Sequence, residues 1–185
     1  MNDWKHPGGK LIELGSQELT AEELVTILIG TGYKDRTAAD IAKELFDTYY
    51  SLYGLLGKTP ADLSKIKGLK KSKIKRITAP YEIVKRLITR KGTEHIYPTK
   101  KITLVLPDLS DAELLAVLIG SGYKDKSPED LAEELLKKFK SLDGFWGKDM
   151  SDITEIEGLG DVKAVRIAAA YGIVNRLYRI LMMDA

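Results

Sequence analysis

Residues 19–88 of this chain are repeated by residues 109–178 at a constant offset of 90 positions and without a gap. Of the 70 aligned pairs, 32 are identical. The identical pairs include five glycines, so the repeat preserves turns as well as apolar positions. A repeat of this length corresponds to a small domain rather than to one unit of a solenoid. The duplication therefore predicts two copies of one module, called repeat 1 and repeat 2 below.

The domain boundaries follow from this alignment. We expect a first module over 10–88, a linker over 89–107 and a second module over 108–182. Modules of this size bury a limited core, so docking of one on the other would stabilise both. The linker is basic, and its stretch 101–105 is predicted to be extended at most.

Composition limits the chemistry and the compartment. The chain has no cysteine, which excludes disulfides and Cys-ligated metal or iron sites. No apolar run approaches the roughly 20 residues of a membrane span, and the first ten residues lack the apolar core of a signal peptide. We therefore expect a soluble, cytoplasmic protein with no membrane partner and no cofactor.

Both repeats carry the pattern of helices. Thr20 followed by Glu23, and Ser110 followed by Glu113, are capping-box signals ahead of an apolar run with helical spacing. No segment alternates for long with the period of a strand. The predicted fold class is all-α, with two tandem helix-hairpin-helix modules that each contain two hairpins.

The turns between these helices resemble the helix-hairpin-helix motif of DNA-binding proteins. The sequence IEGLGDVKAVRI at 156–167 matches the motif fully, and IKGLKKSKIKRI at 66–77 matches it except that Lys70 replaces the second glycine. The sequences LIGTG at 28–32 and LIGSG at 118–122 resemble a looser first hairpin in each repeat.

The order of these elements in both repeats resembles the N-terminal domain of the bacterial RadC family. In that family the domain precedes a zinc-dependent metalloprotease fold. This chain has only two histidines, His6 and His95, and neither lies in the H-x-H pattern that such a fold needs. The resemblance implies the accessory DNA-binding domain without the enzyme.

Phosphate binding at such a turn has a physical basis. A turn that leads into a helix leaves unpaired backbone N–H groups at the positive end of the helix dipole, which suits a phosphate oxygen. In repeat 1, seven Lys or Arg residues and no acid lie within residues 65–76, which favours nucleic-acid contact over a merely solvated lysine face. The residues predicted to contact DNA at this turn are Gly68, Leu69, Lys70, Lys71, Ser72, Lys73, Lys75 and Arg76.

The second turn of repeat 2 has better glycines and less favourable charge. Glu155, Glu157 and Asp161 surround it, and Lys163 and Arg166 are the nearby cations. A structural or protein-contact role is therefore favoured over phosphate binding for this copy. The candidate DNA-binding residues there are Gly158, Gly160, Lys163 and Arg166.

The first turns are less polarised, and the sequence leaves their role open. Each combines two glycines with a tyrosine and two cations. The candidates are Gly30, Thr31, Gly32, Lys34 and Arg36 in repeat 1 and Gly120, Gly122, Lys124 and Lys126 in repeat 2.

The sequence shows no paired carboxylates, catalytic triad or metal cluster, so we expect no enzymatic activity. The main hypothesis is sequence-nonspecific binding of nucleic acid, with DNA favoured over RNA, in DNA repair or recombination. The alternative is an interaction module whose acidic repeat 2 docks a protein partner or another subunit. A third hypothesis is an accessory domain for a metalloprotease on a separate chain.

Overall fold

The computed structural model describes residues 6–91, 106 and 108–183, and the regular elements in this part of the chain are helical. They are α1 (Pro7–Leu14), α2 (Ala21–Ile29), α3 (Ala38–Tyr49), α4 (Pro60–Ser64), α5 (Lys71–Arg90), α6 (Asp111–Ile119), α7 (Pro128–Phe139), α8 (Met150–Thr154) and α9 (Asp161–Met183), with short 3₁₀ turns between them. The predicted all-α class is confirmed. The segment 101–105, expected to be extended at most, lies outside the described residues. Within the described residues, no helix is both long and apolar enough to cross a membrane.

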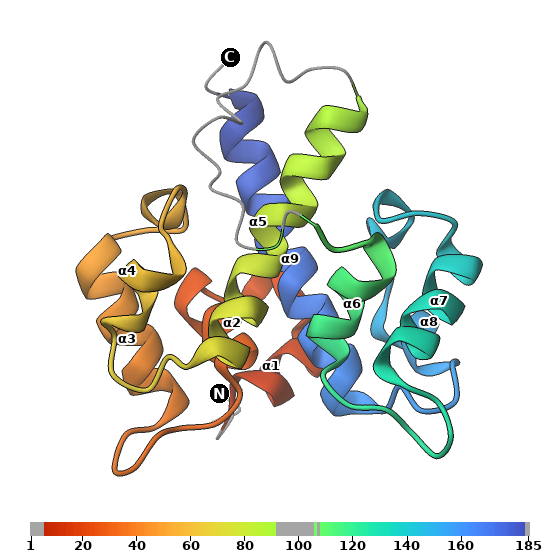
Figure 1. The fold of residues 1–185 in the computed structure, drawn as a ribbon, viewed down its shortest axis with the longest axis horizontal. Helices are drawn as coiled ribbons and strands as arrows, with labels where there is room; N and C mark the ends of the chain where they lie inside the picture. The colour runs from red at the N-terminus through yellow and green to blue at the C-terminus, as the bar shows by residue number, and fades with distance from the viewer. Residues whose placement is uncertain (1–5, 92–105, 107, 184–185) are drawn as a thin grey trace.

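The helices of repeat 1 have counterparts in repeat 2. Helices α2, α3, α4 and α5 begin 90 residues before α6, α7, α8 and α9, respectively. In Figure 1, α3 and α4 lie on one side of the molecule and α7 and α8 on the other, with α2, α5, α6 and α9 between them. The two repeats therefore present matching outer helices around a common centre.

Local hydrogen bonds fix where the helices begin. The Glu23 amide donates to Thr20 Oγ1 at 3.1 Å, and the Thr20 amide donates to the Glu23 carboxylate at 2.7 Å. The same reciprocal arrangement opens α3, α4, α6 and α7. Each such cap stabilises its helix by about 1 kcal/mol. The capping boxes predicted at Thr20 and Ser110 are confirmed.

One apolar core extends through both repeats. Helix α5 of repeat 1 packs on α6 of repeat 2, whereas α9 of repeat 2 packs on α2 of repeat 1, and α5 and α9 also contact each other. Buried side chains from both repeats, such as Ile77 and Val174, belong to one continuous cluster. Each repeat therefore completes the core of the other. Of the predicted linker, residues 89 and 90 form the end of α5.

Arginines at equivalent positions of α5 and α9 each form hydrogen bonds to the other repeat or to the segment before it. Arg86 donates to the carboxylates of Glu82 at 2.7 Å and Asp111 at 2.9 Å. Its counterpart Arg176 donates instead to backbone carbonyls, including those of Ser16 at 3.2 Å and Gln17 at 3.3 Å. Arg176 has no such carboxylates beside it, because Ala21 is the counterpart of Asp111 and Gly172 is the counterpart of Glu82. Nη1 of Arg176 is buried and, among the described residues, has no hydrogen-bond partner.

Replacing Ala21 with aspartate is expected to stabilise the protein by about 1 kcal/mol. The new carboxylate would take the place that Asp111 has beside Arg86, and Ala21 and Arg176 already line the same surface pocket. It would also lie at the positive end of α2. Urea denaturation followed by circular dichroism measures the effect.

A double-mutant cycle provides the control for this prediction. The gain should disappear when Arg176 is replaced by leucine, because only the helix-dipole contribution of a few tenths of a kcal/mol then remains. An equal gain in both backgrounds would show that Arg176 does not bind the new carboxylate.

Candidate nucleic-acid interface

The second turn of repeat 1 leads directly into the long helix α5. Ile66 and Leu69 are buried and anchor the turn, whereas Gly68 between them has φ of 101°, a conformation that strains other residues. Helix α5 begins after Lys70, whose side chain makes no capping hydrogen bond. The first amides of α5 therefore lack the side-chain acceptor that opens α2, α3 and α4. This leaves positive partial charge at the surface.

The two turns of repeat 1 pack against each other. A Cβ on Gly68 would lie 2.8 Å from Ile41 Cδ1 and 3.0 Å from Tyr33 Cβ, so only glycine allows this approach. Lys73 Nζ donates to the carbonyl of Thr31 at 2.6 Å, and Arg36 Nη1 donates to the carbonyl of Lys67 at 3.0 Å. The first and second turns of repeat 1 therefore form one continuous surface.

Two predicted DNA-binding cations thus form hydrogen bonds within the protein. Lys73 is buried, and its burial, together with repulsion from Arg76 and Lys70, lowers the pKa of its ammonium group. Arg36 also forms a 2.5 Å ion pair with Glu44. Their contacts hold the two turns of repeat 1 together.

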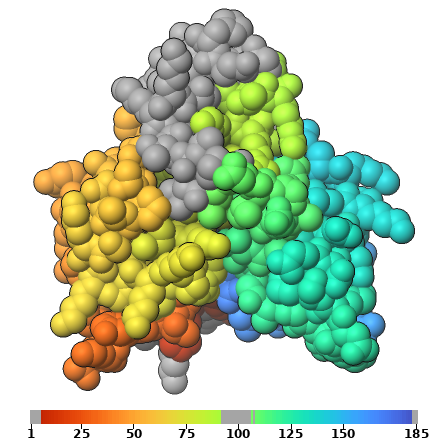
Figure 2. Space-filling view, viewed as in Figure 1, coloured from red at the N-terminus to blue at the C-terminus, as the bar shows by residue number. Residues whose placement is uncertain are grey.

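Four other lysines point outward around the joined turns. Lys34, Lys67, Lys70 and Lys71 are exposed, and within the described residues none of them forms an ion pair. The ammonium groups of Lys34 and Lys70 lie 5.7 and 5.2 Å from the centroid of the Tyr33 ring, which links both turns through cation–π contacts. We call these four lysines the basic face. In Figure 2 its two segments, around residues 30 and 70, are orange and yellow.

Repeat 2 has the same turn geometry but paired charges. A Cβ on Gly158 would lie 2.7 Å from Tyr123 Cβ, and Lys163 Nζ donates to the carbonyl of Gly122 at 3.0 Å. Glu157, which stands where repeat 1 has Lys67, forms a 2.6 Å ion pair with Lys124. This hydrogen bond raises the pKa of the Lys124 ammonium group and lowers the pKa of the Glu157 carboxyl group.

The remaining cation of that first turn is also paired, because Lys126 lies 2.6 Å from Glu134. Carboxylates of repeat 2 therefore neutralise both cations that were predicted to bind phosphate there.

The remaining candidates divide between surface and interior. Leu69 is buried and anchors its turn. Arg166 Nη1 donates to the carbonyls of Leu118 at 2.9 Å and Ile119 at 2.8 Å, at the end of α6. Lys75 and Arg76 are half-buried. The predicted DNA-binding residues that are exposed on the turns are Gly30, Thr31, Gly32, Ser72, Gly120, Gly122 and Gly160.

The inward direction of Lys73 could have been found from the sequence. Lys73 lies four residues before Ile77 and eight before Tyr81, so helical spacing places it on the buried stripe of α5. The cluster of charges concealed this signal.

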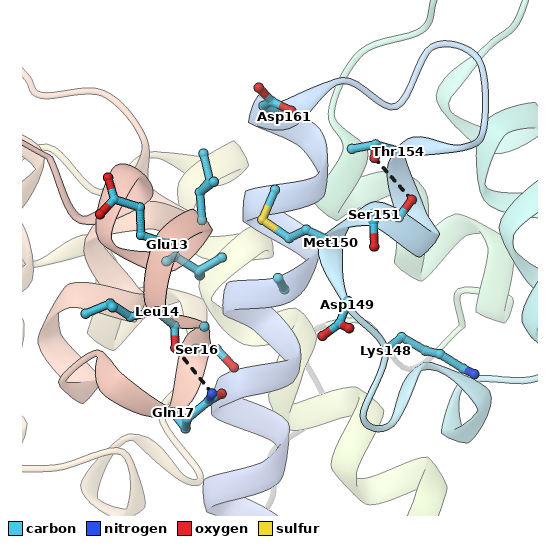
Figure 3. A pocket seen from close by; sticks show the side chains of 14 residues that line it. Glu13, Leu14, Ser16, Gln17, Lys148, Asp149, Met150, Ser151, Thr154 and Asp161 are labelled. Atoms are coloured by element: carbon cyan, nitrogen blue, oxygen red, sulfur yellow. Dashed lines mark hydrogen bonds between the residues drawn. The ribbon is translucent and has the colours of Figure 1, made fainter.

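A hollow lies between α1 and the segment that contains α8 (Figure 3). None of the predicted DNA-binding residues lines it. Its lining includes the carboxylates of Glu13, Asp149 and Asp161 and one cation, Lys148. This charge disfavours phosphate. Across the part of the chain that the structure describes, no group of three or more His, Cys, Asp or Glu side chains is arranged to hold a metal ion.

The UPF0758 N-terminal family model matches residues 1–75 and 105–165 of this chain. A UPF0758 protein of Alkaliphilus oremlandii is 31% identical over 139 residues, which are 75% of this chain and 48% of that protein. UPF0758 proteins of Flavobacterium johnsoniae and Lactococcus lactis are 41% and 42% identical over 68 and 69 residues, in each case 37% of this chain and 30% of the relative. The chain thus spans less than half the length of these relatives. No solved structure matches it significantly.

Proposed function

This chain belongs to the UPF0758 N-terminal family, the RadC-like region that its motifs predicted, and from this membership and the geometry of its turns we propose that it is a non-enzymatic DNA-binding protein. It contacts backbone phosphates and does not read base sequence. The observation that carries this proposal is the basic face, in which four exposed lysines without ion partners among the described residues surround the uncapped start of α5.

The energetics of α5 support a bound anion. Lysines beside the positive end of a helix dipole each destabilise the free protein by a few tenths of a kcal/mol to about 1 kcal/mol. A phosphate at this position reverses the sign of that contribution, because it interacts favourably with the lysines and with the helix amides. Since backbone contacts position a protein without specifying sequence, the binding is nonspecific.

We further propose that the chain is a tandem duplication of the family's N-terminal domain. Two observations support this: the family model matches two segments, and the helices recur at an offset of 90 residues. The preference for DNA over RNA, and a role in repair or recombination, rest on the resemblance to helix-hairpin-helix proteins.

The proposal predicts steep salt dependence of DNA binding. If the four lysines of the basic face each neutralise one phosphate, the slope of log affinity against log salt is about −3.6, and affinity falls about 150-fold between 50 and 200 mM salt. Fluorescence anisotropy with two duplexes of unrelated sequence measures both slope and specificity. We expect equal affinities for the two duplexes; a difference above tenfold would contradict nonspecific binding, and no binding at 50 mM salt would refute the proposal.

A protein-interaction role for repeat 2 is the second candidate function. The hollow between α1 and α8 favours it, because carboxylates there lie beside the half-exposed apolar side chain of Ile12. This candidate gains support if the protein does not bind duplex DNA at low salt.

A further inference from the structure

A groove lies where the start of α5 from repeat 1 meets α6 from repeat 2. It has a volume of about 570 Å³, and Ser72, Lys75 and Arg76 line one side while Val117, Gly120 and Arg166 line the other. Helices α5 and α6 are in contact, and their yellow and green segments meet near the centre of Figure 2. The groove begins beside the basic face, because Ser72 directly follows Lys71.

Two arginines at equivalent positions of the two repeats line this groove. Arg76 and Arg166 are 90 residues apart and both half-buried. Arg166 donates its hydrogen bonds to Leu118 and Ile119 through Nη1 alone. Arg76 donates from Nε to the Ser72 carbonyl at 3.5 Å. Much of each guanidinium group therefore has no acceptor among the described residues.

No carboxylate pairs with the two arginines within the described residues. Neither forms an ion pair there, whereas Arg36, Arg86 and Arg90 all do. Burial and then repulsion from Arg76 lower the pKa of the Arg166 guanidinium, and burial lowers that of Arg76. Two like charges held together in a half-buried groove are unfavourable unless an anion joins them.

A carboxylate in the groove does not supply that anion. Glu113 and Glu129 both line the groove, but the Glu113 carboxylate accepts a 2.7 Å hydrogen bond from the Ser110 amide in the cap of α6. Glu129 forms no ion pair with either arginine within the described residues. The forked donors of a guanidinium group suit a tetrahedral oxyanion, to which they can donate two parallel hydrogen bonds.

We infer that Arg76 and Arg166 together bind one phosphate group, in a site that both repeats build. This inference rests on the proposed function: a duplex on the basic face would place a neighbouring backbone phosphate in the groove. Repeat 2 then contributes to DNA binding through Arg166 at the junction, although its own turn is neutralised by carboxylates.

Charge-removing substitutions test this site. We expect Arg76→Gln and Arg166→Gln each to lower duplex affinity about 5- to 10-fold and to reduce the salt slope by about 1. The double variant should lose less than the product of the two single losses, because both arginines hold the same phosphate. Arg179→Gln is the matched control, since it removes an exposed arginine from α9 outside this groove and should leave affinity unchanged.

Two further measurements separate binding from folding and identify the source of the phosphate. Arg166→Lys keeps the charge at the end of α6 but loses the fork, so its melting temperature should stay near that of the wild type while its duplex affinity falls. Sodium phosphate should raise the melting temperature of the wild type above its value in sodium chloride of equal ionic strength, but should not do so for the double glutamine variant.

The outcomes distinguish this site from the basic face. Wild-type duplex affinity in the folded double glutamine variant would overturn the inference, and the proposed function would survive if substitution of the basic face still abolished binding. Stabilisation by phosphate together with unchanged duplex affinity would overturn the assignment to DNA. Absence of duplex binding by the wild type would refute the proposed function itself.

Discussion

Replacing Arg86 with alanine is expected to lower the free energy of unfolding by about 3–5 kcal/mol, the usual cost of removing one partner from a buried ion pair. Glu82 is only 6% exposed, and its Oε2 atom has no hydrogen-bond partner among the described residues even with Arg86 in place. Burial by itself would lower the pKa of the Arg86 guanidinium, but hydrogen bonds to Glu82 and Asp111 raise it above its usual value. The substitution therefore leaves an unpaired charge inside the shared core.

Urea denaturation of this variant should be compared with that of Arg90→Ala. Arg90 lies 2.7 Å from the same Asp111 but its side chain is 48% exposed, so its loss should cost less than about 1 kcal/mol. Replacing Arg86 by methionine and Glu82 by glutamine together should recover much of the lost stability, because no buried charge then remains. An Arg86→Ala variant within 1 kcal/mol of the wild type would show that this network does not hold the two repeats together.

Replacing Lys67, Lys70 and Lys71 with glutamate is expected to lower affinity for duplex DNA by at least about 100-fold at moderate salt, or about 2.7 kcal/mol of binding free energy. Each substitution removes a cation from the basic face and adds an anion that repels phosphate. Lys73 is left unchanged in this variant because its ammonium group holds the first turn at Thr31. Anisotropy titrations at fixed salt measure the loss.

The matched control places the same change of charge elsewhere. Lys137, Lys140 and Lys148 are exposed residues of repeat 2, and their replacement by glutamate should reduce affinity by less than about fivefold. Equal losses in the two triple variants would mean that net charge, rather than the basic face, governs binding.

The parts of the fold that depend on neighbouring residues were predictable from the sequence. A capping box such as Thr20 with Glu23 acts over three residues, and the glycine turns act over a similar range, so the helix starts and turns could be placed without a structure. The direction of Lys73 was also local, but the prediction grouped it with the exposed lysines around it.

The arrangement between the repeats was not predictable in this way. The contact of α9 with α2 depends on which apolar faces fit, and helical periodicity shows only that such faces exist. The pairing of Lys124 with Glu157 and the placement of Arg76 and Arg166 in one groove are likewise products of packing between segments far apart in sequence. For this reason the sequence predicted the turns and their charges but not the groove between α5 and α6.

The packing of α5 on α6 and of α9 on α2 has a consequence for how the two halves can diverge. One repeat alone would expose the faces that the other repeat covers here, and two identical chains could cover them only as a symmetric homodimer. In such a homodimer every substitution appears twice, so a lysine at one turn is also a lysine at the other. A single chain that contains both halves is free of that constraint. Lys67 and Glu157 can therefore differ at equivalent positions, which gives the molecule one cationic side and one neutralised side that no homodimer of this fold could have.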